Sequence, residues 1–213
     1  GMTLPAGSRE REILRSATPE SERPVVIVGP FEHHSNELPW RESLATVIRL
    51  PLDALGQPCV ATLEERLLQY ADRPQRIVAL SAASNVTGVV TDLCAVARLV
   101  HRHRGRLFVD YAAGAPYLPI NMAGTGDGDH IDAAFISPHK FVGGPGASGI
   151  LVADRALHLG EMPTAAGGGT VRFVSPSRHS YVSDIEQLEE AGTPGILGDI
   201  RAGLVMQLKS DIG

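Results

Sequence analysis

The chain has few cysteines, few aromatic residues and no long apolar run. Its 213 residues include 2 cysteines, and aromatic residues make up only 5% of the total. Cys59 lies in a polar loop and Cys94 in a helical pattern, which indicates neither a disulfide framework nor a metal site. No apolar run approaches the roughly 20 residues that a membrane span needs, and the N-terminus shows no basic-then-apolar signal pattern. We therefore expect a cytoplasmic protein without a membrane partner.

An excess of basic residues is also absent. The chain has 19 Lys and Arg residues against 24 Asp and Glu residues, which gives a formal net charge of -5 and a pI near 5.9. Proteins that bind nucleic acid usually carry a basic patch, so nucleic acid is not an expected partner. Hydrophobic residues make up 43% of the chain, which is enough for one sizeable core.

Six short apolar runs alternate with helical patterns along the chain. Each run ends in Gly, Pro, Ser, Asp or Ala, which is typical of strands that are buried on both faces of a parallel sheet. The runs cover residues 24–30, 45–51, 76–83, 106–113, 132–137 and 148–154. Strands that alternate with helices predict an α/β fold, here a three-layer αβα arrangement around a mostly parallel sheet.

Two of the helical patterns have clear apolar faces. Residues 62–73 begin with Thr62 and Glu65 at the spacing of a capping box. Residues 91–105 direct apolar side chains to one face, and Gly105 is predicted to stop this helix. The residues expected to face inward are Leu63, Leu67 and Tyr70 in the first helix and Leu93, Val96, Ala97 and Val100 in the second. Residues 161–180 are rich in glycine and predict a long irregular loop.

Chemically active side chains follow the predicted strands. The carboxyl ends of the strands form the ligand crevice of an open α/β sheet, so these side chains are expected to converge. They are Glu32, His33, His34 and Asn36 after the first run, Ser84 and Asn85 after the third, Asp110 at the end of the fourth, and Ser137, His139 and Lys140 after the fifth. A partly desolvated lysine amine can act as the nucleophile that a Schiff base needs. A neighbouring carboxylate can hold a pyridine nitrogen protonated, which makes pyridoxal phosphate (PLP) an electron sink.

Plainer interpretations exist for these residues. Lys140 could be a solvated surface charge, and Asp110 could cap a helix or a turn. His33, His34 and Asn36 could ligate a metal, but no further carboxylate or cysteine lies at ligand spacing, so no metal site is predicted.

A pair of histidines occurs in the second helical pattern. His101 and His103 are two residues apart, so they point to different faces of the predicted helix. We expect both side chains to be solvated.

Five stretches carry a resemblance to a known family. In chain order they read "FEHHSNELPW", "SAASNVTGVVTDL", "FVDYAAGAPYLPINM", "FISPHKFVGGPGASGILV" and "EEAGTPG". Together they resemble the class V aminotransferase family of fold-type I PLP enzymes, and most closely its cysteine desulfurase branch. The resemblance covers about residues 25 to 200.

The resemblance implies a role for seven residues. Lys140 would form the Schiff base with PLP, Asp110 would pair with the pyridine nitrogen, and His33 would stack on the ring; these three are the expected catalytic set. The other expected cofactor-binding residues are Ser137 and His139 at the phosphate, Asn85 near the cofactor and the substrate carboxylate, and Thr193, which would reach a phosphate across a dimer interface. A homodimer is therefore expected, since the site would be shared between subunits.

Three departures from the family pattern stand out. Ala113 occupies the position, three residues after the aspartate, at which desulfurases usually have a glutamine. Residues 2–24 occupy the place of a phosphate-binding turn, and the chain stops at Gly213, about where a C-terminal small domain begins in the family. We therefore expect a partly disordered N-terminal segment, residues 1–23, followed by a PLP-binding large domain over residues 24–213 without the small domain.

Two hypotheses of function remain open. The first is a PLP-dependent aminotransferase or cysteine desulfurase-like protein that acts on a small amino acid through a Lys140 Schiff base. The alternative is a truncated or degenerate PLP-fold domain that dimerises but has little or no turnover. Neither Cys59 nor Cys94 lies where the family's persulfide cysteine would be, which counts against sulfur transfer by this polypeptide alone.

Overall fold

All six predicted strands are present and form one sheet. The computed structural model describes residues 9–158 and 160–212. The strands are Val25–Val28 (β1), Thr46–Arg49 (β2), Arg76–Ser81 (β3), Arg106–Asp110 (β4), Ala133–Ile136 (β5) and Ile150–Ala153 (β6). Their order across the sheet is β2-β1-β3-β4-β5-β6. Every neighbouring pair is parallel except β5 and β6, so the prediction of a mostly parallel sheet is confirmed.

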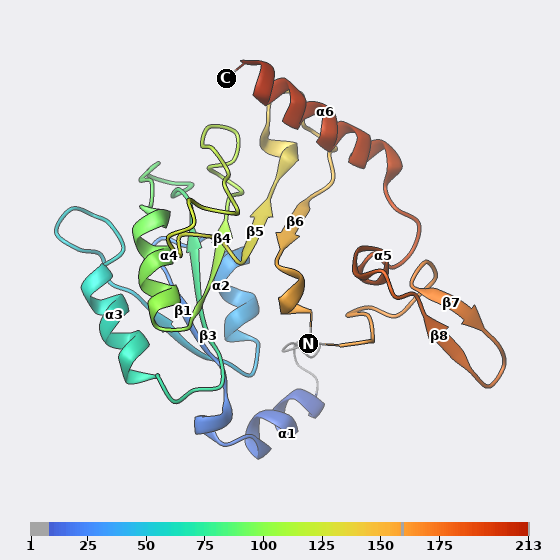
Figure 1. The fold of residues 1–213 in the computed structure, drawn as a ribbon, viewed down its shortest axis with the longest axis horizontal. Coiled ribbons are helices and arrows are strands. Elements are labelled where there is room, and N and C mark those ends of the chain that lie inside the picture. The colour runs from blue at the N-terminus through green and yellow to red at the C-terminus, as the bar shows by residue number, and fades with distance from the viewer. Residues whose placement is uncertain (1–8, 159, 213) are drawn as a thin grey trace.

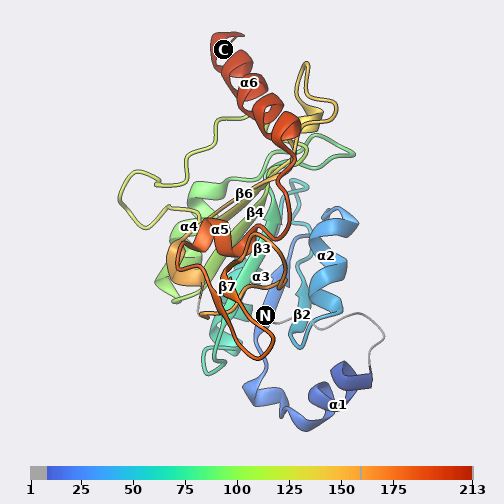
Figure 2. The ribbon, with the colours of Figure 1, turned by 90° about the vertical axis from the view of Figure 1, so that its right-hand side faces the viewer.

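Helices cover both faces of this sheet. The α-helices are Arg9–Ala17 (α1), His34–Arg41 (α2), Val60–Gln69 (α3), Leu93–Arg102 (α4), Ile185–Glu189 (α5) and Ile196–Ile212 (α6). Short 3-10 helices span Glu20–Glu22 (η1), Pro138–Lys140 (η2) and Arg155–Leu157 (η3). The helices α3 and α4 lie on one side of the sheet and α2 on the other, which gives the three layers (Figure 2).

Two hydrophobic clusters correspond to the two faces. Alternate residues of β1 enter different clusters: Val25 and Ile27 pack with α3 and α4, whereas Val26 and Val28 pack with Trp40 of α2. All four residues of β1 are fully buried. Successive side chains of a strand point to opposite faces of the sheet, so a strand that is covered on both faces needs an apolar residue at every position. This explains why the apolar runs are continuous.

The two predicted helices form, but their ends differ from the prediction. The capping-box prediction is wrong, because Cys59 is the N-cap of α3, no side chain caps this end, and Thr62 lies inside the helix. At the end of α4 the left-handed residue is Arg104, with φ 55°, instead of the following glycine. The Gly105 backbone N–H donates to the carbonyl oxygen of Val100 at 2.9 Å, which closes the helix in the manner of a Schellman motif. A Cβ on Gly105 would lie 2.9 Å from a Val100 methyl carbon, so the glycine permits close packing here.

Residues 161–180, predicted as an irregular loop, contain part of a second sheet. Strands Val171–Val174 (β7) and His179–Tyr181 (β8) pair antiparallel beyond the edge of the main sheet (Figure 1). The glycines lie before this hairpin, and the strand signal in residues 171–174 is short and half-polar. The prediction of irregular structure is therefore wrong for the second half of this segment.

The first helix, α1, and the last helix, α6, lie at opposite ends of the fold (Figure 1). Residues 1–8 of the predicted N-terminal segment lie outside the described residues, and residues 9–23 form α1 and η1. The Arg73 side chain ties η1 to the domain through an ion pair with Glu20 at 3.2 Å. No helix in the described part of the chain is both long and apolar enough to span a bilayer.

Candidate functional site

The chain order of the strands reverses at β1. From β1 the chain moves outward to β2, then returns to place β3 on the other side of β1. At such a switch point the loops that follow the two neighbouring strands run in opposite directions, which opens a crevice at the carboxyl ends of these strands. The segments that leave β1 and β3 here contain residues 29–33 and 82–85, so the predicted site residues of both loops lie at this point.

A small hollow at these strand ends brings four predicted residues together. His33 comes from the loop after β1, Asn85 from the loop after β3, Asp110 from the end of β4, and Lys140 from η2 after β5. The remaining lining residues are Ser81, Ala83, Ala112 and Ala113. Because these side chains come from four separate segments of the chain, only the folded sheet can assemble them.

Lys140 is the last residue of η2 and is exposed at the hollow. Its backbone N–H donates to the Ser137 carbonyl oxygen at 3.0 Å, while the adjacent Phe141 is buried in the main core. Within the described residues, the structure shows no hydrogen bond or ion pair at Lys140 Nζ. The chain therefore holds the backbone of this lysine and leaves its amine available to a ligand.

Asp110 and His33 are each fixed by a local backbone bond. The Ala112 N–H donates to Asp110 Oδ1 at 2.7 Å, which holds the carboxylate at the end of β4. His33 is the N-cap of α2, and its Nδ1 accepts from the Ser35 N–H at 3.2 Å. Since Nδ1 accepts this bond, the neutral ring carries its proton on Nε2.

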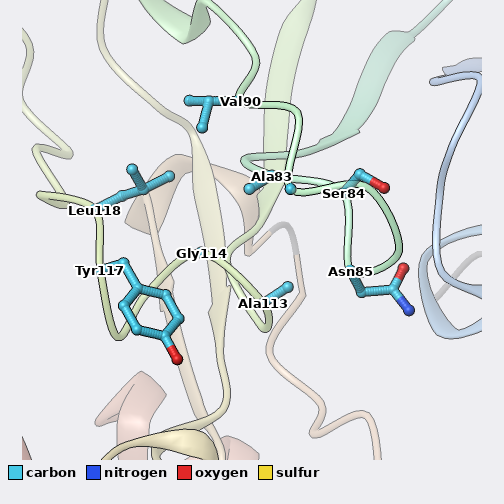
Figure 3. A pocket seen from close by; sticks show the side chains of 9 residues that line it. Ala83, Ser84, Asn85, Val90, Ala113, Gly114, Tyr117 and Leu118 are labelled. Atoms are coloured by element: carbon cyan, nitrogen blue, oxygen red, sulfur yellow. The ribbon is translucent and has the colours of Figure 1, made fainter.

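A second, larger cavity adjoins the first. Its volume is about 290 Å³, and it shares Ala83, Asn85 and Ala113 with the small hollow. Figure 3 shows Asn85 and Tyr117 on opposite sides of this cavity, with Ala113 between them. Ser84 Oγ accepts from the N–H groups of residues 86 and 87, so the loop that presents Asn85 has its own internal support.

Three predicted site residues do not line either cavity. Ser137 is the half-buried N-cap of η2, and His139 is exposed on η2 beside Lys140. Thr193 is exposed in the loop between α5 and α6. The structure thus brings together the amine, the carboxylate, the imidazole and the amide of the predicted set, and leaves the three predicted phosphate-binding residues outside the cavity lining.

Sequence reasoning placed Glu32 at a strand end but assigned it no role. This residue is buried, and its carboxylate accepts the Ser81 N–H at 2.9 Å, the Ser81 Oγ–H at 2.6 Å and the Asn36 Nδ2–H at 2.7 Å. Burial raises the pKa of Glu32, the three hydrogen bonds oppose that rise, and the negative charge of Asp110 adds to it. The contact with Ser81 could not be predicted because the two residues are 49 positions apart.

The expectation of solvated histidines on α4 is wrong. His101 Nδ1 lies 2.6 Å from the Gly128 carbonyl oxygen, and Nε2 lies 2.9 Å from Asp132 Oδ2. The ring of His130 stacks on His101 with centroids 3.8 Å apart, and His103 lies 3.4 Å from a Glu64 oxygen. The long loop before β5 folds back over the end of α4, a contact that helical periodicity does not reveal.

Ligand atoms of His101, His130 and Asp132 lie within 4.8 Å of one another, a separation that a metal ion would permit. Both His101 nitrogens and both Asp132 oxygens already have hydrogen-bonding partners, among them the Arg106 guanidinium. Stacked parallel rings also direct their lone pairs side by side instead of toward one point. We therefore describe this group as a hydrogen-bonded network.

The chemistry around the small hollow suits one type of cofactor. A free amine can bind an aldehyde, a carboxylate can pair with a protonated ring nitrogen, and an imidazole can stack on a flat ring. Lys140, Asp110 and His33 supply these three groups at one place. PLP carries an aldehyde, a pyridine nitrogen and a flat ring, so the residues present fit it.

Comparisons with known proteins agree with this chemistry. The family model for Aminotransferase class-V matches residues 13–213. A probable cysteine desulfurase of Halalkalibacterium halodurans is 33% identical over 196 residues, which cover 88% of this chain and 45% of that protein. A cysteine desulfurase of Escherichia coli O8 is 32% identical over 194 residues, again 88% of this chain and 45% of the relative.

Solved structures show the same fold. The cysteine desulfurase CsdA of Escherichia coli, in an S-sulfonic acid form, matches with a TM-score of 0.74 and 31% identity over 93% of this chain and 48% of that protein. The cysteine desulfurase of Thermococcus onnurineus matches with a TM-score of 0.75 and 25% identity over 90% of this chain and 46% of that protein. The chain thus spans less than half of the length of these relatives, over a region that includes the cavity residues. It belongs to the class V aminotransferase family, whose members depend on PLP.

Proposed function

We propose that this chain binds PLP through Lys140 and takes part in a reaction on a small amino acid. The observation that carries the proposal is the hollow in which Lys140, Asp110 and His33 meet from three different segments of the chain. Because the chain covers less than half of the relatives' length, the complete activity of those relatives is itself only proposed for this chain.

Each side chain has a definite task in this proposal. When bound, PLP supplies an electron sink that allows the Cα–H bond of an amino acid to be broken. Lys140 Nζ would hold the cofactor aldehyde, and as a free amine it would accept the Cα proton as general base. The Asp110 carboxylate would keep a pyridine nitrogen protonated, and the His33 ring would provide a flat surface for the cofactor ring. Asn85 borders both cavities and so is placed to donate to a ligand that extends from one to the other.

The reaction type is left at the level of the family. Both free cysteines lie on the helical layer, Cys59 at the start of α3 and Cys94 in the first turn of α4, and neither lines a cavity described above. We therefore propose amino-acid chemistry with PLP, and assign the persulfide step of a desulfurase to no residue of the described chain.

A homodimer is part of the proposal. The long helix α6 leaves several large apolar side chains exposed, with Ile196, Ile200 and Leu204 between 55% and 64% exposed. Apolar surface of this kind commonly lies in an interface between subunits. In such a dimer Thr193, which precedes α6, would reach the partner's cofactor phosphate. Sedimentation equilibrium tests this part, and a monomer at micromolar concentration would contradict it.

Reductive trapping tests the Lys140 assignment sharply, because the sequence contains only two lysines, Lys140 and Lys209. Lys209 Nζ donates to the carbonyl oxygens of Ala115 and Leu118 at 2.5 Å each, and burial lowers its pKa. Incubation with PLP, reduction with borohydride and peptide mapping should place the pyridoxyl group on Lys140. Lys140→Ala should remove the label, whereas Lys209→Ala should retain it.

The outcomes separate the two hypotheses of function. Label on Lys140 together with turnover of an amino acid would support the enzyme. Label without turnover would favour a PLP-fold domain that binds the cofactor and dimerises. Absence of label, or equal label on Lys209, would refute PLP binding by this chain.

A further inference from the structure

Glu32 joins the two loops on either side of the switch point. Its backbone precedes His33, while its carboxylate receives both the N–H and the Oγ–H of Ser81, the last residue of β3. A third bond from Asn36 ties the same carboxylate to the first turn of α2. One buried side chain therefore connects the end of β1, the start of α2 and the end of β3.

Close packing around Glu32 restricts the position of its carboxylate. A Cβ on Gly29 would lie 2.2 Å from Glu32 Oε1, so the carboxylate occupies space that only a glycine can offer. Glu32 is 9% exposed, Asn36 is 7% exposed and Ser81 is 4% exposed. Hydrogen bonds among groups this buried are costly to break, because the separated partners would not regain water.

Ser81 also connects Glu32 to the carboxylate side of the hollow. Ser81 pairs in register with Asp110 across β3 and β4, and it lines the hollow together with His33 and Lys140. A second bond from Thr91 Oγ1 to the Ser81 carbonyl oxygen, at 2.8 Å, holds the strand end from the other side. A change in the Glu32 bonds would therefore alter the position of His33 relative to Asp110.

We propose that Glu32 is a positioning residue for the cofactor, which holds the His33 turn against the end of β3 so that imidazole and Asp110 carboxylate face the same hollow. This inference rests on the proposed PLP function and deepens it. The negative charge of Asp110 acts on Glu32, whereas its hydrogen-bonding partners Ser81 and Asn36 are neutral.

The test compares three variants of the same chain. Glu32→Ala removes all three bonds, and Glu32→Gln keeps the length of the side chain and an oxygen that accepts the Ser81 N–H. Glu37→Ala is the matched control, since Glu37 is equally buried on α2 but pairs with Arg41 and Arg49 away from the hollow. The equilibrium dissociation constant of PLP is measured by absorbance titration for each variant. Hydrogen exchange without PLP is followed in peptides that cover residues 29–37 and 77–85.

We expect Glu32→Ala to weaken PLP binding at least tenfold and to speed exchange of both peptides, including the Ser81 amide. Glu32→Gln should stay within about threefold of the wild type, and Glu37→Ala should lower the melting temperature while it leaves the PLP constant within twofold. If Glu32→Ala does not fold, Asn36→Ala, which deletes one of the three bonds, should still weaken PLP binding about threefold.

Three results would overturn the positioning role: unchanged PLP binding in Glu32→Ala, a Glu32→Gln variant as weak as Glu32→Ala, or a Glu37→Ala variant that loses PLP binding equally. Failure of the wild-type chain to bind PLP would refute the proposed function instead. In that case hydrogen exchange without PLP still tests whether Glu32 holds the His33 turn against the end of β3. Unchanged protection of both peptides in Glu32→Ala would refute that role.

Discussion

Asp132 offers a stability prediction that follows directly from its contacts. The residue is 3% exposed and directly precedes β5. Its carboxylate accepts the Leu107 N–H at 2.8 Å and the Arg106 Nη1–H at 3.1 Å, and Oδ2 lies 2.9 Å from His101 Nε2. Asp132→Ala deletes all of these contacts at once.

The expected loss can be worked out contact by contact. Leu107 is fully buried, so its N–H loses an acceptor where water cannot replace it, which costs about 1–3 kcal/mol. The Arg106 side chain is 44% exposed, and solvent screening limits that pair to about 0.5 kcal/mol. The His101 contact, with the ring 14% exposed, adds about 1 kcal/mol. We expect Asp132→Ala to lower the free energy of unfolding by about 3 kcal/mol in total, and the melting temperature by roughly 6–12 °C.

Urea denaturation followed by circular dichroism measures this change. Asp132→Asn, which keeps one acceptor oxygen, should cost about half as much. Asp127→Ala is the control, since Asp127 is exposed in the loop before β5, and it should change stability by less than about 0.5 kcal/mol. An Asp132→Ala variant within 0.5 kcal/mol of the wild type would refute the view that this carboxylate ties the loop to β4.

Two further predictions concern acid stability and the turn that carries Lys140. Burial alone would raise the pKa of Glu37, but hydrogen bonds and charge from two arginines lower it below its ordinary value of 4.5. The ionised carboxylate therefore stabilises the fold above about pH 4.5, and this contribution is lost as the pH falls through the lowered pKa. The free energies of unfolding of wild type and Glu37→Gln should differ by about 1–2 kcal/mol at pH 7 and converge as the pH falls through the lowered pKa, whereas a difference that stays constant in acid would contradict this direction. A Cβ at Gly144 would lie 2.0 Å from the Pro138 carbonyl oxygen, so Gly144→Ala should cost about 2 kcal/mol or more and weaken PLP binding. Gly149→Ala, where the nearest atom lies 3.9 Å from the new Cβ, should be mild by comparison in a thermal melt.

Much of the site could be predicted from the sequence because its residues follow apolar runs. His33, Asn85, Asp110 and Lys140 each come within a few residues of a strand end, and the strand ends of a parallel sheet meet at one edge. Ser137 and His139 also follow a strand, whereas Thr193 was predicted from family resemblance alone, and all three lie outside the cavity lining of this chain. Their contact with the phosphate of a bound cofactor, across a subunit interface in the case of Thr193, stays a prediction.

The ends of helices and the contacts between residues far apart in the chain were harder to predict. A local sequence pattern indicates which side chains are buried, but not which residues they contact. The spacing of Thr62 and Glu65 matches a capping box, yet α3 begins two residues earlier, at Val60, where the chain leaves the turn after β2. His101 looked solvated because the loop that covers it lies about 30 residues away in the chain.

The sequence by itself determined which segments form the main sheet and which chemical groups stand at their ends, because a strand buried on both faces requires a continuous apolar run. It could not determine which strands are neighbours, since the apolar runs are interchangeable in composition. Only the tertiary structure placed β3 beside β1, and that adjacency brings Ser81 to Glu32 and Asp110 to His33. The contacts that hold the site in place are thus long-range hydrogen bonds between buried polar groups, whose partners are decided by packing of the whole sheet.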